Sequence, residues 1–253
     1  MKELIHIAQG DFPKYETLLL RRDQLKKEAL IIRRAYIKEF GELINKKFEK
    51  MIACIELKKK IAFCALIVNR GEQPDQDEME AYIEQQMSDY RSQLTEMIKE
   101  LNSTKEDSVI TPADAQEIKS IYRKIARSLH PDLSTIMTDH PEMSEIWNRV
   151  SVAYKCNDLK SIRELDVLVT RALAQLGEET QCNVIPNIEK KISELEKEIE
   201  EIINTEPYAF KLILENQSEI EEKKAVLEAE YRQYCSYEEL LKQQLEMLMG
   251  EGE

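Results

Sequence analysis

The sequence predicts an all-α protein, and three observations support this prediction. Charged residues make up 34% of the chain, which contains only six glycines and seven prolines. Glu, Lys, Leu and Ile are abundant, and a chain rich in these residues and poor in turn formers favours long helices. No stretch shows the alternation of apolar and polar residues, bounded by turn residues, that is typical of a half-buried strand. We therefore expect helices throughout.

A long antiparallel helical hairpin is expected over residues 1–102. Apolar residues recur at steps of three and four over residues 13–70 and again over 79–101, which is the period of a helix with one buried face. Residues 69–78 combine Gly, Pro and Asp, so they predict the turn between the two helices. Gly41 either kinks the first helix or divides it in two, and the sequence leaves both possibilities open.

A central helical module is expected over residues 111–176. It follows a polar linker at 103–110, after which Thr111 provides an N-cap and Pro112 suits the first helical position. Two further helices with an apolar stripe follow. The module ends before Gly177, because glycine commonly follows the end of a helix.

A second hairpin, with coiled-coil character, is expected over residues 188–253 after a linker at 177–187. Apolar residues step by four and three from Ile188, and those from Ile213 recur every seven positions, which indicates a heptad seam. The companion positions of the second helix are partly polar. Its seam is completed either by the first hairpin or by another subunit in a homodimer, and the sequence leaves this open.

The net charge of −13 conceals a segregation of charge along the chain. Residues 13–66 hold 14 Lys and Arg against 7 Asp and Glu, whereas residues 177–253 hold 8 against 20. Because the acidic segments can neutralise the basic one, we expect them to pack side by side. For the same reason, the basic segment is not expected to bind nucleic acid.

Neither a membrane segment nor a disulfide framework is indicated. The longest apolar run, Ile61–Val68, is far shorter than the ~20 residues that cross a bilayer, and the N-terminus lacks the apolar core of a secretory leader. The five cysteines are scattered and odd in number, without the spacing of a zinc site. They predict reduced, mostly buried thiols, a cytoplasmic protein and no metal.

The first helix of the central module combines an apolar face with basic residues that point toward solvent. The basic residues are Arg123, Lys124 and Arg127. Pro131 ends this helix, because the residue before a proline is pushed out of the α region. His130, Pro131 and Asp132 therefore begin a loop.

The core of the module follows from the helical period of its first two long helices. The expected core residues are Tyr122, Ile125, Leu129, Trp147, Val150 and Tyr154. Aromatic side chains contribute a large apolar surface to a core, so we expect these residues to support the loop structurally.

Residues 115–133 (AQEIKSIYRKIARSLHPDL) and 146–159 (IWNRVSVAYKCNDL) resemble a J-domain, the module of the DnaJ-type co-chaperones. A basic helix, the tripeptide His130-Pro131-Asp132 and the pair Ala153-Tyr154 occur in the order that the family shows. The resemblance covers residues 111–165, roughly a quarter of the chain.

The chain departs from the J-domain pattern at three points. The Tyr-Tyr and Leu-Gly signature of a first helix is not visible upstream, and the helix expected over 77–101 is a candidate to replace it. Leu133 follows the tripeptide where Lys or Arg is common. Residues 157–168 (NDLKSIRELDVL) stand in place of the family's Lys-Arg and Tyr-Asp ending.

The resemblance implies a co-chaperone that docks on an ATP-bound heat-shock chaperone of the seventy-kilodalton class and stimulates its ATP hydrolysis. Such a protein is not itself an enzyme and needs no cofactor. The three basic residues would steer onto an acidic patch of this partner. His130 and Asp132 would face outward and offer hydrogen bonds from a loop that Pro131 fixes, so that little entropy is lost on docking. The hairpins would bind a client protein or a second copy.

Two other classes of function remain open. A structural coiled-coil scaffold, with a degenerate J-like module and no chaperone activity, is consistent with Leu133 and the missing first-helix signature. An enzyme would use His130 as a base, or gather His130, Asp132 and His140 around a metal. No nucleophile with a partner, phosphate-binding loop or carboxylate pair accompanies these residues, so we do not expect an enzyme.

Overall fold

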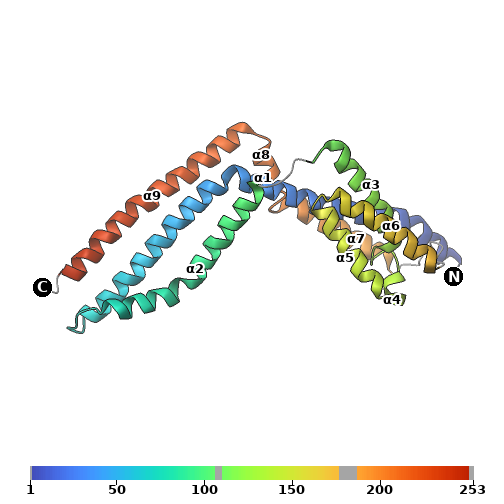
Figure 1. Ribbon diagram of the computed structural model, residues 1–253. Helices are drawn as coiled ribbons and strands as arrows, with labels where there is room; N and C mark the ends of the chain where they lie inside the picture. Colours follow the sequence, from blue (N-terminus) through green and yellow to red (C-terminus); the bar gives the residue numbers. More distant parts are fainter. Residues whose placement is uncertain (1, 106–109, 177–186, 251–253) are drawn as a thin grey trace. The chain divides into compact units, whose positions relative to one another are not determined.

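The computed structural model describes residues 2–105, 110–176 and 187–250, and within these ranges the fold is all-α, as predicted. No strand occurs in this part of the chain. The expected linker at 177–187 and Cys182 lie outside it, except for Asn187. Figure 1 labels the helices, which are α1 (Lys2–Val68), α2 (Gln76–Lys105), α3 (Pro112–Leu129), α4 (Ile136–Asp139), α5 (Glu142–Lys155), α6 (Leu159–Leu176), α7 (Ile188–Asn204), α8 (Phe210–Leu214) and α9 (Gln217–Gly250).

Helix α1 is continuous through Gly41, so residues 13–68 form one helix and not two, and residues 69 and 70 belong to the turn that follows. A Cβ atom at Gly41 would lie only 3.0 Å from Cδ1 of Leu101 on α2. The absence of a side chain at Gly41 therefore allows Leu101 to approach the backbone of α1.

The chain forms two compact units, and their boundaries differ from the expected domains. The first unit combines Met1–Ile32 with Ser108–Ala209, and the second combines Arg33–Asp107 with Phe210–Glu253. Residues 1–102 are therefore not one domain, because the first part of α1 packs with the central module. Residues 188–253 are not one hairpin either, because α7 belongs to the first unit and α9 to the second.

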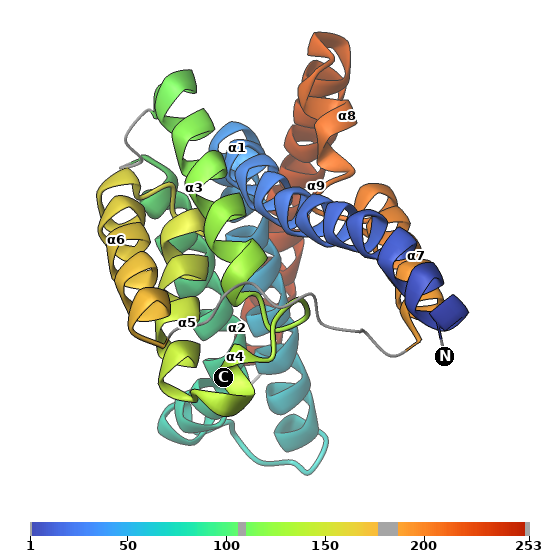
Figure 2. The ribbon, with the colours of Figure 1, turned by 90° about the vertical axis from the view of Figure 1, so that its right-hand side faces the viewer.

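The core of the first unit is built mainly by α3, α5 and α6, which lie side by side in Figure 2. Leu20 of α1 joins this core. Its other buried residues are Ile118, Tyr122, Ile125, Ala126, Leu129, Ile136, Met143, Trp147, Val150, Ala153, Tyr154, Ile162, Leu165 and Val169. All six expected core residues are among them. Helix α2 does not replace a first helix of the module, because it belongs to the second unit; the first stretch of α1 packs on the module instead.

A second apolar cluster joins α1, α7 and the segment after Asp132. Tyr15 and Leu19 of α1 pack with Leu133 and with the first apolar residues of α7. The α7 residues are Ile188, Ile192 and Leu195. The predicted apolar stripe of α7 is thus buried against α1 and Leu133, and not against α9.

The second unit is a bundle of long helices in which the later part of α1 packs with α2 and α9 (Figure 1). Phe40 is completely buried, and it packs with Ile220 and Leu227 of α9. Leu245 and Leu248 pack against the cluster that α1 and α2 form. The heptad stripe of α9 is therefore covered within the same chain.

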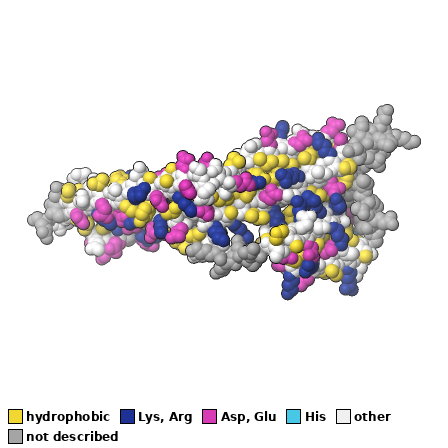
Figure 3. Space-filling model, turned by 90° about the horizontal axis from the view of Figure 1, so that it is seen from above, with side chains coloured by type: hydrophobic (Ala, Val, Ile, Leu, Met, Phe, Trp, Pro, Cys, Tyr) yellow, Lys and Arg dark blue, Asp and Glu magenta, His cyan; other side chains and the backbone are white. Residues whose placement is uncertain are grey.

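Ion pairs confirm the expected pairing of the basic helix with acidic segments. In the second unit Lys47 and Lys50 lie 3.0 Å and 2.7 Å from Glu230 and Glu238 of α9. In the first unit Lys14 lies 2.9 Å from Glu196 of α7. Figure 3 shows basic and acidic side chains interspersed on the face that it draws.

Two further sequence expectations concern membranes and thiols. Among the described helices, none combines the length and apolar character needed to cross a membrane. Cys54 and Cys64 are buried thiols, whereas Cys156 is exposed and Cys235 is half-buried. The expectation of mostly buried thiols is therefore wrong for Cys156, which follows the last residue of α5 at the surface.

Candidate functional site

Helix α3 begins and ends where its sequence directs. The backbone N–H of Asp114 donates to Oγ1 of Thr111 at 3.1 Å, and Pro112 occupies the first helical position, where a missing N–H costs nothing. Pro131 ends the helix, and His130 already has an extended backbone with φ −65° and ψ 131°. The last turn of α3 is therefore followed directly by the loop at residues 130–135.

This loop is fixed by hydrogen bonds to His130. The backbone N–H groups of Leu133 and Ser134 both donate to the carbonyl oxygen of His130 at 2.9 Å. The N–H of Asp132 donates to Nδ1 of the His130 ring at 3.0 Å. Because Nδ1 accepts, a neutral imidazole carries its proton on Nε2.

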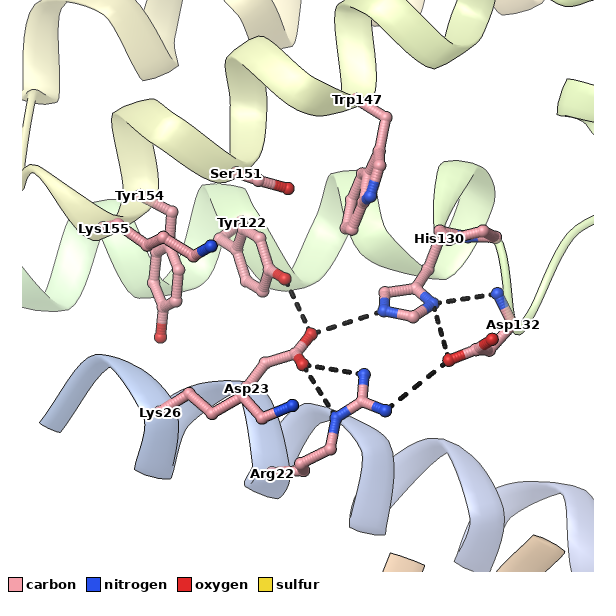
Figure 4. A pocket seen from close by; sticks show the side chains of 11 residues that line it. Arg22, Asp23, Lys26, Tyr122, His130, Asp132, Trp147, Ser151, Tyr154 and Lys155 are labelled. Atoms are coloured by element: carbon pink, nitrogen blue, oxygen red, sulfur yellow. Dashed lines mark hydrogen bonds and ion pairs between the residues drawn. The ribbon is translucent and has the colours of Figure 1, made fainter. Parts of the chain in front are cut away.

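His130 does not face outward, contrary to the sequence expectation. The residue is only 4% exposed, and its ring packs edge-on against Trp147 with centroids 4.9 Å apart. Its Nε2 lies 3.4 Å from Oδ2 of Asp23 on α1 (Figure 4). The covering helix is distant in sequence, so the local pattern around the loop could not predict it. Pro131 and Asp132 do reach the surface, and the Asp132 side chain is 44% exposed.

Asp23 is the centre of a buried polar network. The hydroxyl of Tyr122 donates to its Oδ2 at 2.7 Å, and Arg22 donates to Oδ1 through Nε at 3.1 Å and Nη2 at 2.9 Å. Burial raises the pKa of the Asp23 carboxyl. The contacts with His130 and Tyr122 and the charge of Arg22 outweigh this effect and lower its pKa from 3.8 to about 2. Asp23 is therefore a fixed anion, held by several donors.

Arg22 connects this network to the surface of the loop. Its Nη1 lies 3.6 Å from Oδ2 of Asp132 and 3.7 Å from Oε2 of Glu198 on α7. Lys26, one turn further along α1, lies 2.6 Å from the other oxygen of Glu198. One carboxylate of α7 therefore holds two basic side chains of α1 beside the loop.

A second contact between α1 and the module is aromatic. Tyr122 stacks on Tyr154 with ring centroids 3.8 Å apart, and Nζ of Lys27 lies 4.0 Å from the Tyr154 ring centroid. Burial lowers the pKa of the Lys27 ammonium to about 8, and the charge of Lys119 acts in the same direction. The cation–π contact compensates in part for the hydration energy that this ammonium group loses on burial.

The three expected basic residues are exposed, as expected, but each has a partner. Nε of Arg127 lies 2.7 Å from Oε1 of Glu16 on α1, with the arginine side chain 62% exposed. Nη2 of Arg123 donates to Oε1 of Gln24 on α1 at 3.4 Å. Lys124, 61% exposed, pairs with Asp166 of α6 at 2.8 Å. Two of the three basic residues thus contact α1.

A cavity of about 280 Å³ lies between α1, the loop and α5 (Figure 4). It is lined by Arg22, Asp23, Lys26, Tyr122, His130, Pro131, Asp132, Trp147, Ser151, Tyr154 and Lys155. Its lining mixes both charges with aromatic rings. The sequence expectations did not include the α1 and α5 members Arg22, Asp23, Lys26, Ser151 and Lys155. The available signal was Asp23 itself, which lies one turn after Leu19 and Leu20 on the buried side of α1.

Both ring nitrogens of His130 face groups of the protein itself. His130 uses Nδ1 to hold the loop and directs Nε2 at a carboxylate that already has other donors. His140 lies near Glu142, with Nδ1 3.4 Å from its Oε1. Among the described residues, no three His, Cys, Asp or Glu side chains gather in a way that could hold a metal ion.

Comparisons with protein-family models, curated proteins and solved structures found no match to this chain.

Proposed function

We propose that this protein is a J-domain co-chaperone that acts in the cytoplasm. It docks on a heat-shock chaperone of the seventy-kilodalton class in its ATP-bound form and stimulates ATP hydrolysis by that partner. The chain itself performs no catalysis and uses no cofactor. The observation that carries this proposal is the exposed basic face of α3 next to a rigid loop that presents Pro131 and Asp132.

The basic face is suited to steering a negatively charged partner. Arg127 and Lys124 keep most of their side-chain surface in water, 62% and 61% respectively. Exposed ion pairs contribute little to stability, so their present partners can be exchanged at low cost. Opposite charge on a partner then accelerates association and fixes its orientation.

The rigid loop is suited to specific recognition. Its conformation is set by three hydrogen bonds to His130 before any partner arrives, so docking costs little conformational entropy. In this proposal Asp132 is the contact residue. His130 is a positioning residue that holds the Asp132 backbone, and not the outward hydrogen-bond donor that the sequence suggested.

The helical arms offer surface for a client protein or for a second copy. Leu240 and Met247 of α9 are 61% and 67% exposed, and Leu212 of α8 is 75% exposed. Exposed apolar side chains of this size are suited to partner binding when they gather on one face. We therefore include binding of a client protein, or self-association, through these exposed side chains in the proposal.

The test is a steady-state ATPase assay with a purified seventy-kilodalton chaperone and increasing amounts of the full chain. Asp132→Asn keeps the backbone N–H and the size of the side chain but removes its charge. We expect this variant to lose most of the stimulation, roughly tenfold or more, as for a charged hydrogen-bonded contact. Asp139→Asn, an exposed acid on α4, is the matched control and should behave like the wild type.

A structural scaffold is the second candidate, and the burial of His130 favours it. If the network around Asp23 only holds α1 on the module, the loop needs no chaperone partner. The scaffold predicts equal and negligible stimulation by the wild type, by Asp132→Asn and by a variant in which α1 is loosened.

A further inference from the structure

The first stretch of α1 covers the same surface that the proposed partner would use. Arg22 approaches Asp132, the proposed contact residue, and Asp23 contacts His130, the residue that positions it. Glu16 contacts Arg127, and Gln24 contacts Arg123 on the basic face. Residues 16–24 of α1 thus reach the loop and the basic face together.

The chemistry of these contacts matches what the proposed partner would supply. A partner with an acidic patch would offer carboxylates to the arginines of α3, and Glu16 already does so. A partner that binds the Asp132 carboxylate would offer a basic group, as Arg22 does. Residues 16–24 therefore present to the module the charge pattern that docking would require.

Leu133 and helix α7 pack against this stretch of α1. Leu133 is 5% exposed and packs with Tyr15 and Leu19 of α1 and with α7. The carboxylate of Glu198 pairs with Arg22 and Lys26. A lysine or arginine at position 133, common in the J-domain family, would place a charge in this apolar cluster.

We infer that residues 15–27 of α1, supported by α7, are an internal competitor that must leave the loop before a chaperone can dock. We call this stretch the α1 clamp. The inference rests on the proposed co-chaperone function and adds its regulation. The α1 clamp lowers the apparent affinity for the chaperone by the fraction of molecules in which it is open.

The contacts of the α1 clamp are of a kind that a partner can replace. Most of those described on the loop and the basic face are charged or polar, and opening returns these groups to water or transfers them to the partner. The apolar exceptions are Leu20, which enters the core of the module, and Tyr15 and Leu19, which pack with Leu133. The Lys27 ammonium over Tyr154 is a further exception. Leu20 is the residue of 16–24 that belongs to this core, so opening there removes one side chain and leaves the packing among α3, α5 and α6 in place.

The test uses the full chain and a double variant, Arg22→Ala with Asp23→Asn. Asn keeps a hydrogen-bond acceptor for Tyr122, whereas the two changes remove the charges that face Asp132 and His130. We expect the concentration for half-maximal stimulation of the chaperone ATPase to fall roughly threefold to tenfold, because the open fraction rises. Adding Asp132→Asn to the double variant should abolish the gain.

Two further variants separate opening from damage to the fold. Glu16→Gln with Gln24→Ala weakens the contacts to the basic face and leaves those of Arg22 and Asp23 with the loop, so it should give a smaller gain in the same direction. Gln24→Ala also removes a hydrogen bond to Glu28 within α1. Lys14→Gln removes a contact of α1 with Glu196 of α7 that does not involve the loop, so it should leave stimulation unchanged. Circular dichroism establishes that each variant retains its helices.

The outcomes separate this inference from the proposed function. If Asp132→Asn abolishes stimulation but the double variant equals or falls below the wild type, the α1 clamp is refuted and the co-chaperone proposal stands. If no variant stimulates the chaperone, the co-chaperone proposal fails. The α1 clamp, as a competitor of the chaperone, then fails with it.

Discussion

The two stretches of α1 are held to their units in different ways. Residues 33–68 pack through a completely buried ring, Phe40, with ion pairs such as Lys47–Glu230 at the periphery. Residues 15–27 bury apolar side chains such as Leu19 as well, but they also place charged side chains inside the contact: Arg22 and Asp23 are 15% and 13% exposed.

This difference separates a structural contact from one that can serve as a switch. A contact built on apolar burial has no strong dependence on pH or on a charged competitor. A buried ionic network loses much of its favourable energy to desolvation, and it can be opened by protonation or by a better ionic partner. Each prediction below tests one side of this contrast.

The largest effect is expected at Phe40. Phe40→Ala removes a fully buried ring from the second unit and should lower its free energy of unfolding by about 3–5 kcal/mol. Hydrogen exchange in peptides from α9 measures this loss. Leu66→Ala, at a side chain that is 52% exposed on the same helix, is the control, and a comparable loss there would break the contrast.

An intermediate effect with a clear pH dependence is expected at Asp23. Its pKa is lowered from 3.8 to about 2, so the folded state binds its proton less readily than the unfolded state does. The resulting stability, about 2 kcal/mol, is fully present above pH 4–5 and is lost as the pH falls toward 2.

Asp23→Asn should therefore destabilise the first unit near pH 7 and have little effect near pH 2. Denaturant unfolding at several pH values, followed by hydrogen exchange in α3, provides the measurement. A loss that is the same at both ends of this range would mean that Asp23 contributes through its shape and not through its charge.

The smallest effect is expected at the peripheral ion pairs of the second unit. Lys47→Gln breaks the pair with Glu230 and should cost less than about 1 kcal/mol, with the difference shrinking in high salt. Urea unfolding at low and high ionic strength measures it, with the exposed Lys38→Gln as reference. A cost comparable to that of Phe40→Ala would show that charge also holds this stretch.

The parts that the sequence predicted well depend on local periodicity. The all-α class and the buried positions of α3 and α5 followed from the spacing of apolar residues, and the end of α3 followed from Pro131. Even the apolar stripe of α7 was located correctly, since Ile188, Ile192 and Leu195 are buried. These features require only the neighbours of a residue along one helix.

The parts that it did not predict depend on which helices meet. The partner of Tyr122 in its hydrogen bond, Asp23, is 99 positions away in the sequence. Periodicity identifies the buried side of a helix but not the helix that covers it. The outward orientation expected for His130 was wrong for this reason, and α7 was paired with α9 when its partner is α1.

The division of α1 between two units also affects how the chain is made. Tyr15 and Leu19 leave the ribosome before Leu133 and Ile188, which cover them and follow only after more than a hundred further residues. During synthesis these apolar side chains therefore stay uncovered until their final neighbours have been made. Exposed apolar surface of this kind makes a nascent chain prone to misassembly. The protein proposed here to assist other folding chains would thus itself pass through an interval in which it needs protection.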